Sequence, residues 1–156
     1  MRTFWGCASA ILASGLFCVP AVAQEDAKPD LTGTWQLDAA KSEMPLNKLA
    51  GLTMQISEKD GKISIDEDEK LAAGKERKIT YTCTTDGKEC EVPETKAKAS
   101  FWYNGPMLVS METEHNGASV IRRRLKLSPD SKLLNVEISI LAPMSDKTDK
   151  LVLAKQ

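Results

Sequence analysis

Apolar and polar residues alternate in short segments along residues 31–156, and turn residues separate the segments. A period of two places successive side chains on opposite faces of a β-strand. The segments follow one another at the spacing typical of antiparallel sandwiches and barrels. The pattern predicts ten strands, at residues 31–37, 52–58, 62–67, 76–84, 88–92, 96–103, 107–115, 118–127, 133–141 and 149–155.

Glycine-containing dipeptides lie between several of these strands and predict tight hairpins. Four of them, Asp60-Gly61, Asp86-Gly87, Asn104-Gly105 and Asn116-Gly117, tolerate positive φ at both central positions of a type I′ turn. The polar stretch 128–131 supplies a further turn. We therefore expect consecutive strands to be neighbours linked by hairpins.

No long amphipathic pattern interrupts the strands, which excludes a parallel βαβ architecture. The helical candidate is the stretch 38–44, where Asp38 can cap the first turn and Pro45 ends it. We predict an all-β fold, a single antiparallel up-and-down β-barrel of about eight to ten strands with a short helical turn after the first strand. Closure of such a barrel removes exposed strand edges. A two-sheet sandwich is the alternative, because period-two patterning alone does not separate the two folds.

The first 23 residues have the features of a secretory signal peptide. Arg2 precedes an apolar run over residues 4–19, and the small residues 21–23 offer a cleavage site. A membrane anchor is the alternative, but polar residues and a proline interrupt a run shorter than the about 20 apolar residues that cross a bilayer. A lipoprotein anchor at Cys18 is disfavoured because the bulky Phe17 precedes it. We expect an exported protein, periplasmic or secreted.

After the signal peptide, we expect a polar leader at residues 24–30 and one domain at residues 31–156, a length that suits a single core. The whole chain has a formal net charge of -1, and removal of the basic signal peptide makes it slightly more negative. This balance does not point to nucleic acid as a partner. No transmembrane segment is expected after cleavage.

Two of the four cysteines, Cys83 and Cys90, lie outside the signal peptide. An even pair in an exported chain is typical of a disulfide. With Asp86-Gly87 as a two-residue turn, the two cysteines lie directly opposite each other at a separation that a disulfide accepts. A redox or metal-binding pair is the alternative, but neither CxxC spacing nor a nearby histidine supports it.

The opening stretch LTGTWQLDAAKSEMP places Gly33 and Trp35 on one strand face. Trp35 is expected to be a large buried ring, and Gly33 to let another segment approach where a side chain would collide. Residues 38–46 are expected to fold across one end of the barrel as a plug.

This stretch resembles the calycin superfamily, which includes lipocalins and fatty-acid-binding proteins, in its G-x-W on the first strand. More closely, GTWQLDAAKSEM resembles the G-T-W-x-L-x-x-A-K-S opening of small exported bacterial lipocalin-like proteins. The resemblance implies that Gly33 and Trp35 belong to the barrel floor. The C-terminal helix of lipocalins is missing, and the gap after the first strand is short for the two-helix lid of fatty-acid-binding proteins. The resemblance therefore implies a fold and no ligand class.

Arg123 is the single charge on an otherwise apolar face of the segment 120–127, whereas Arg122 and Arg124 lie on the polar face. A buried guanidinium must be paired or stacked, because its desolvation costs several kcal/mol. Three alternatives follow. Arg123 stacks on Trp35, as the resemblance to calycins implies; it pairs with a ligand carboxylate inside the barrel; or the register lets it reach solvent.

Three aromatic residues join Arg123 as candidate ligand-binding residues. Phe101 and Tyr103 share a face with small apolar residues and are expected in the core, whereas Trp102 points the other way. Trp102 is either a contact for a partner or ligand, or a cover for nearby apolar surface. Tyr81 could place its hydroxyl in the cavity, with core packing as the alternative.

The sequence offers no convincing catalytic set. The acidic run 66–69 lacks the spaced ligands of a calcium loop and is interpreted as a solvated loop. His115, the only histidine, abuts a turn and has no nucleophile or carboxylate constellation beside it. No glycine-rich phosphate loop and no N-x-S/T sequon occur. We predict no metal, no cofactor and no enzymatic activity.

The leading hypothesis is an exported, non-enzymatic β-barrel that binds a small apolar or amphipathic molecule. The motivating features are the G-x-W opening, the meander of strands, and an apolar inner face with one cation. The alternative is a protein-binding or envelope-associated module whose barrel is filled by its own side chains.

Overall fold

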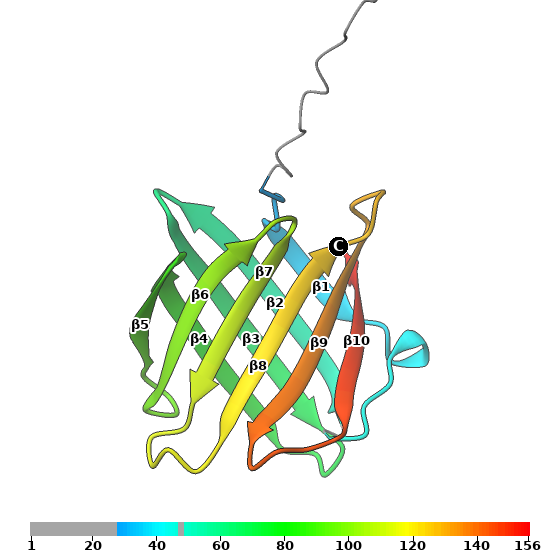
Figure 1. Cartoon of the computed structure of the whole chain (residues 1–156). Coiled ribbons are helices and arrows are strands. Elements are labelled where there is room, and N and C mark those ends of the chain that lie inside the picture. Colours follow the sequence, from blue (N-terminus) through cyan, green and yellow to red (C-terminus); the bar gives the residue numbers. More distant parts are fainter. Residues whose placement is uncertain (1–27, 47–48) are drawn as a thin grey trace, which may run out of the picture.

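The structure is a computed structural model that describes residues 28–46 and 49–156. The predicted signal peptide, residues 1–23, lies outside the described residues. Ten antiparallel strands form one sheet in the order β4-β3-β2-β1-β10-β9-β8-β7-β6-β5. The sheet curls into a nearly closed barrel (Figure 1). The strands are β1 Gly33–Leu37, β2 Leu49–Lys59, β3 Lys62–Leu71, β4 Glu76–Thr84, β5 Asp86–Val92, β6 Ala97–Asn104, β7 Met107–Thr113, β8 Val120–Leu127, β9 Leu133–Ala142 and β10 Thr148–Lys155. The predicted up-and-down barrel is confirmed, and the sandwich alternative is wrong.

The alternation of apolar and polar residues decides which face of each strand points inward. In β3, for example, Ile63 and Ile65 are buried, whereas Ser64 and Asp66 face outward. The buried face of each strand joins one hydrophobic cluster inside the barrel. A single core is therefore enclosed by one curved sheet.

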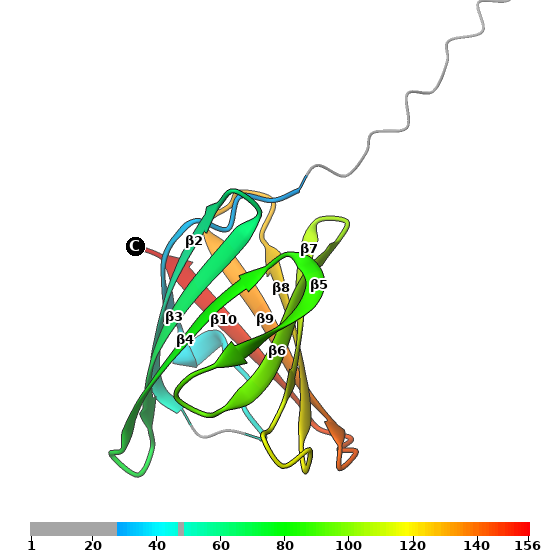
Figure 2. The same ribbon diagram turned by 90° about the vertical axis from the view of Figure 1, so that its left-hand side faces the viewer.

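The barrel closes through its first and last strands, because β1 pairs with both β2 and β10. Consecutive strands from β5 to β10 and from β1 to β4 are neighbours, as the hairpin signals predict. The sheet order begins with β4 and ends with β5. These two strands approach each other on the side of the barrel seen in Figure 2 and form its seam.

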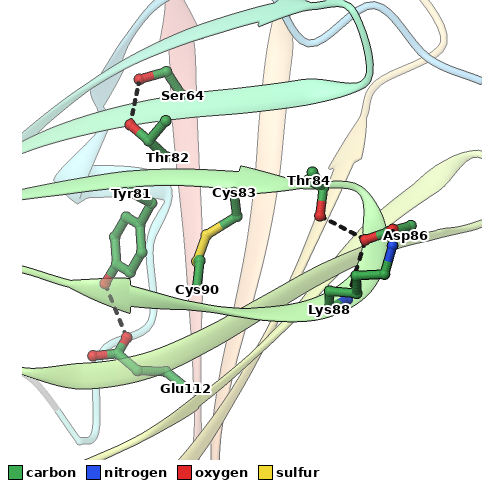
Figure 3. Close-up of a disulfide and its surroundings, with 9 residues drawn as sticks. All are labelled: Ser64, Tyr81, Thr82, Cys83, Thr84, Asp86, Lys88, Cys90 and Glu112. Atoms are coloured by element: carbon green, nitrogen blue, oxygen red, sulfur yellow. Dashed lines mark hydrogen bonds and ion pairs between the residues drawn. A yellow bond between two sulfur atoms is a disulfide. The ribbon is translucent and has the colours of Figure 1, made fainter.

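The disulfide between Cys83 and Cys90 joins the two sides of this seam, with a Cα separation of 5.6 Å (Figure 3). The predicted pairing of the cysteines is confirmed, but the predicted hairpin that brings them together is wrong. Asp86 and Gly87 belong to β5, where Asp86 pairs with Trp102 of β6. The chain instead bends at Thr85, whose N–H donates to Gly61 O at 3.1 Å. The cysteine pair thus links strands at the two ends of the sheet.

Among the other predicted turns, Asp60-Gly61 is confirmed, with φ of 53° and 71° at its two central residues. Asn104 pairs with Met107, so the two-residue loop between β6 and β7 is 105–106 and the register is one residue later than predicted. The residues 116–117 lie within a longer loop between β7 and β8.

A short 3-10 turn, η1 (Ala39–Lys41), follows β1 as predicted. Asp38 makes no side-chain capping hydrogen bond and instead pairs with Lys41 at 2.8 Å. The prediction that residues 38–46 plug one end of the barrel is wrong. Glu43 exchanges two backbone hydrogen bonds with Lys150, of 2.8 and 2.7 Å, so this segment lies beside β10 and extends the wall where β1 has ended. In the described part of the chain, no helix has the length and apolar character needed to cross a membrane.

Trp35 is fully buried, as predicted. Its indole N–H donates to Leu31 O at 2.9 Å, and the ammonium of Lys155 lies 5.2 Å from the ring centroid. A Cβ on Gly33 would lie 3.0 Å from Cε of Lys155, and Gly33 has a φ of 140° that other residues rarely adopt. The predicted close approach at Gly33 is therefore confirmed, and the approaching group is the Lys155 side chain.

Candidate functional site

The lower end of the barrel, as drawn in Figure 1, is the end that carries the connections after β3, β5, β7 and β9. Its inner face is acidic, in contrast to the apolar remainder of the interior. Four carboxylates are buried there, although charged side chains are rarely buried without a partner. They are Glu67, Glu69, Glu112 and Asp149.

Arg123 of β8 lies among these carboxylates, with only 12% of its side chain exposed. Its guanidinium nitrogens lie 3.3 Å from Oε2 of Glu112 and 3.7 Å from Oε1 of Glu67. It also donates a hydrogen bond of 2.6 Å to the hydroxyl of Tyr81, which in turn donates to Oε2 of Glu112 at 2.9 Å (Figure 3 shows the latter bond). We call these four residues the arginine cluster.

The arginine cluster is assembled from several walls of the barrel. Glu112 and Arg123 come from the paired strands β7 and β8, whereas Glu67 and Tyr81 come from β3 and β4 across the interior. The contacts of Arg123 with Glu67 and Tyr81 therefore exist only because the sheet has closed, whereas Glu112 reaches it from the neighbouring strand. Among the three sequence alternatives for Arg123, stacking on Trp35 and exposure to solvent are both wrong. Arg123 instead lies 5.2 Å from the ring centroid of Tyr81, and Lys155 occupies the face of Trp35.

The interpretation of residues 66–69 as a solvated loop is also wrong. These residues continue β3, and Glu67 and Glu69 follow Ile63 and Ile65 on its inward face. The sequence carried one signal of a continuing strand, because no glycine, proline or asparagine interrupts residues 63–69. The charge of these side chains concealed it, since carboxylates are expected on the outer face.

Burial and neighbouring charges shift the acid–base behaviour of the cluster. Burial raises the pKa of the Glu67 carboxyl above its ordinary value, and the nearby guanidinium only partly offsets this. Burial alone would lower the pKa of Arg123, but the carboxylates and Tyr81 outweigh it and raise that pKa. The pKa of the Tyr81 hydroxyl is raised, chiefly by burial. Arg123 and Tyr81 therefore stay protonated, as donors.

A second ion pair lies closer to the opening. Arg77 of β4 is directly opposite Glu69 of β3, and its guanidinium donates to Oε2 of Glu69 at 2.8 Å from Nε and 2.6 Å from Nη2. The Glu69 side chain is 8% exposed, whereas that of Arg77 is 51% exposed. The Glu69 carboxylate therefore has a partner although it is buried.

A cavity of about 330 Å³ opens at the lower end, beside the arginine cluster. Arg123 and Glu112 form part of its wall, and apolar side chains from β4, β6 and β8 form another part. Its rim includes the β7–β8 loop. The apolar lining residues are Ile79, Ala97 and Ile121, and the rim includes Glu114, His115 and Asn116. A hollow of about 740 Å³ over β8 and β9 is larger, but outward-facing charged side chains such as Arg124 and Glu137 line it.

The structure brings together only some of the predicted ligand-binding residues. Tyr81 and Arg123 are in contact, and Phe101 packs edge-on against Tyr81 with ring centroids 5.7 Å apart. Tyr103 lies apart from them: its hydroxyl donates to Oε2 of Glu58 at 2.7 Å, and Lys28 lies over its ring. Only Arg123 among the four lines the cavity.

Two further residues take positions that the sequence left open. Trp102 is partly exposed on the outer face, directly opposite Val109, and Val109 is only 6% exposed although it also faces outward. Trp102 thus covers apolar surface of its neighbouring strand. His115 is exposed at the rim of the cavity. Within residues 28–46 and 49–156, no group of three or more His, Cys, Asp or Glu side chains has the arrangement of a metal site.

No protein-family model and no curated protein matches the sequence. Solved structures nevertheless share the fold. Human cRBP IV superposes with a TM-score of 0.56 at 13% identity, over 82% of this chain and 99% of its own. A structure described as the REP1-NXSQ fatty acid transporter gives a TM-score of 0.57 at 15% identity, over 81% and 96%. Fatty-acid-binding protein 1 of Echinococcus granulosus gives 0.55 at 10% identity, over 80% and 96%. At these identities the likeness shows the fold alone, and this chain therefore has the same antiparallel β-barrel fold as these structures.

Proposed function

We propose that this protein is an exported, non-enzymatic β-barrel that binds a small apolar or amphipathic molecule at its lower end. The observation that carries the proposal is the cavity of about 330 Å³, which combines apolar walls with the polar groups of Arg123 and Glu112. Ligand sites in proteins are typically concave and combine apolar surface with convergent polar groups. Here polar side chains supply more of the wall than apolar ones, which favours an amphipathic ligand. The signal-like sequence of residues 1–23 supports export.

Two of the structures with this fold are described as a fatty acid transporter and a fatty-acid-binding protein, which is consistent with a binding role here. The proposed ligand is smaller than the barrel, because buried side chains occupy much of the interior above the cavity. Those with the least exposure include Trp35, Phe101, Leu108, Leu134 and Leu153.

Native mass spectrometry of the protein purified from its own host tests the proposal. We expect a co-purified small molecule whose signal disappears in an Ile121→Trp variant, because a larger side chain at Ile121 fills the cavity. Val120→Trp is the matched control, since Val120 lies next in the strand and faces outward. Protein that carries no small molecule, or equal retention of the molecule by both variants, would contradict the proposal.

The second candidate is a protein-binding or envelope-associated module, and the packed upper interior is the observation that favours it. Pull-down from the exported fraction, with Trp102→Ala as the comparison, separates the two. A partner captured by the native protein and lost with that substitution would favour this candidate over small-molecule binding.

A further inference from the structure

We infer that the cavity at the lower end selects ligands with an uncharged hydrogen-bonding head group and rejects carboxylates, because Glu112 and Glu67 already neutralise Arg123. The inference rests on the proposed function and specifies its ligand class. It makes Glu67 and Glu112 the residues that determine specificity.

Charge compensation within the protein is the first step. An arginine enclosed in a barrel would attract a ligand carboxylate if nothing else neutralised it. Here the guanidinium nitrogens of Arg123 lie 3.3 Å from Glu112 and 3.7 Å from Glu67. Arg77, the other cation in the cavity wall, is engaged with Glu69 at 2.6 Å. A ligand carboxylate that enters the cavity would have to displace Glu112 or Glu67 from Arg123 or be buried beside them.

A ligand with a positively charged head group is also disfavoured. An ammonium group at Glu112 would compete with Arg123, which is held there by its contact with the carboxylate and by its hydrogen bond to Tyr81. Burial of either kind of ion without a free counter-charge carries a desolvation cost of several kcal/mol. Beside the arginine cluster a charged head group therefore loses its hydration and meets only groups that are already paired with one another.

An uncharged head group needs no counter-charge and has no large desolvation cost. A guanidinium has five N–H donors, and a carboxylate accepts several hydrogen bonds, so Arg123 and Glu112 can each serve a hydroxyl or amide without losing each other. The walls contributed by Ile79, Ala97 and Ile121 suit a hydrocarbon portion. The volume of about 330 Å³ lies near the lower end of the range of about 300 to 1,000 Å³ for ligand pockets, which points to a compact molecule.

Calorimetric titration at neutral pH with octanol, octanoate and octylammonium tests the inference, because these probes share a chain and differ in head-group charge. We expect octanol to bind at least about tenfold more tightly than either ion, the ratio that corresponds to about 1.4 kcal/mol. Amide NMR shifts should place the bound alcohol beside Ile121 and Arg123. Octanoate or octylammonium binding as tightly as octanol would overturn the inference while leaving the proposed function intact.

A Glu112→Gln variant adds a second readout, because it removes one counter-charge and retains an oxygen that can accept from Tyr81. The ratio of octanoate affinity to octanol affinity, measured on the same variant, should rise by about tenfold. Glu137→Gln is the matched control, since Glu137 pairs with Arg124 at 3.5 Å on the outer face. An unchanged preference in a folded Glu112→Gln variant would overturn the inference. If none of the three probes binds the native protein, the proposed function itself fails and the inference with it.

Discussion

Replacement of Arg123 by methionine should destabilise the barrel by about 3 kcal/mol. Methionine retains much of the length and the apolar stem of the side chain but removes the cation. Removal of one partner of a buried ion pair typically costs about 3 to 5 kcal/mol, because the remaining charge is left without compensation. The lower end of that range applies here, since Arg123 keeps 12% exposure and Glu67 can take up a proton.

Urea titration measures the effect. For a small domain the free energy of unfolding falls by about 1 to 3 kcal/mol per molar urea, so the midpoint should fall by about 1 to 3 M. Arg122→Met and Arg124→Met are the controls, because both side chains lie on the outer face of β8. The Arg124 side chain is 40% exposed and its pair with Glu137 lies at the surface, so each control should stay within about 0.5 kcal/mol.

Equal midpoints for the three arginine variants would refute the assignment of faces on β8. A loss below about 1 kcal/mol for Arg123→Met alone would show that its carboxylates are hydrated or protonated and need no counter-charge. The double variant Arg123→Met with Glu112→Gln separates these cases. We expect it to recover part of the loss, because it removes a carboxylate that the single variant leaves unpaired.

Three further predictions follow from the structure. Thiol labelling of non-reduced protein that lacks residues 1–23 should find no free cysteine, and two reactive thiols would contradict the bridge across the seam. The joint substitution of Cys83 and Cys90 by serine should lower the free energy of unfolding by about 2 to 3 kcal/mol. In single-tryptophan variants that lack residues 1–23, acrylamide should quench Trp102 more than Trp35, and equal quenching would contradict the burial of Trp35. Because burial raises the pKa of Glu67 in the fold, its contribution to stability is lost as pH rises above its ordinary value of 4.5 and through the raised one. As pH rises, the urea midpoint of Glu67→Gln should therefore decline less steeply than that of the native protein. Parallel curves for the two proteins would count against a raised pKa of Glu67.

Local pattern was sufficient for the strands and for the general fold. The alternation of side chains over residues 31–156 predicts ten strands in the observed order, and the position of Trp35 within its alternating face predicts its burial. Both predictions use only a few neighbouring residues, because in a strand that is buried on one face every second side chain must be apolar. The same reasoning identifies Arg123 as an inward-facing cation that needs compensation.

Pairing across the barrel is different, because it depends on where distant strands meet. The cysteines are joined as expected, yet through a seam between β4 and β5 and not through a hairpin. Lys155 lies over Trp35 because the last strand returns beside the first, a contact between the two ends of the domain that no local pattern contains.

The sequence by itself therefore determined the strands, their inward faces and the single cation on an apolar face, since each of these is a property of one segment. Only the tertiary structure decided what that cation meets. Glu67 lies in an acidic run that has the composition of a solvated loop, and Glu112 belongs to a strand without any marked motif. Closure of the barrel brings Glu67 to Arg123, and Glu112 reaches it from the neighbouring strand β7. Burial makes both pairings necessary, because a charge removed from water must find its partner within the fold.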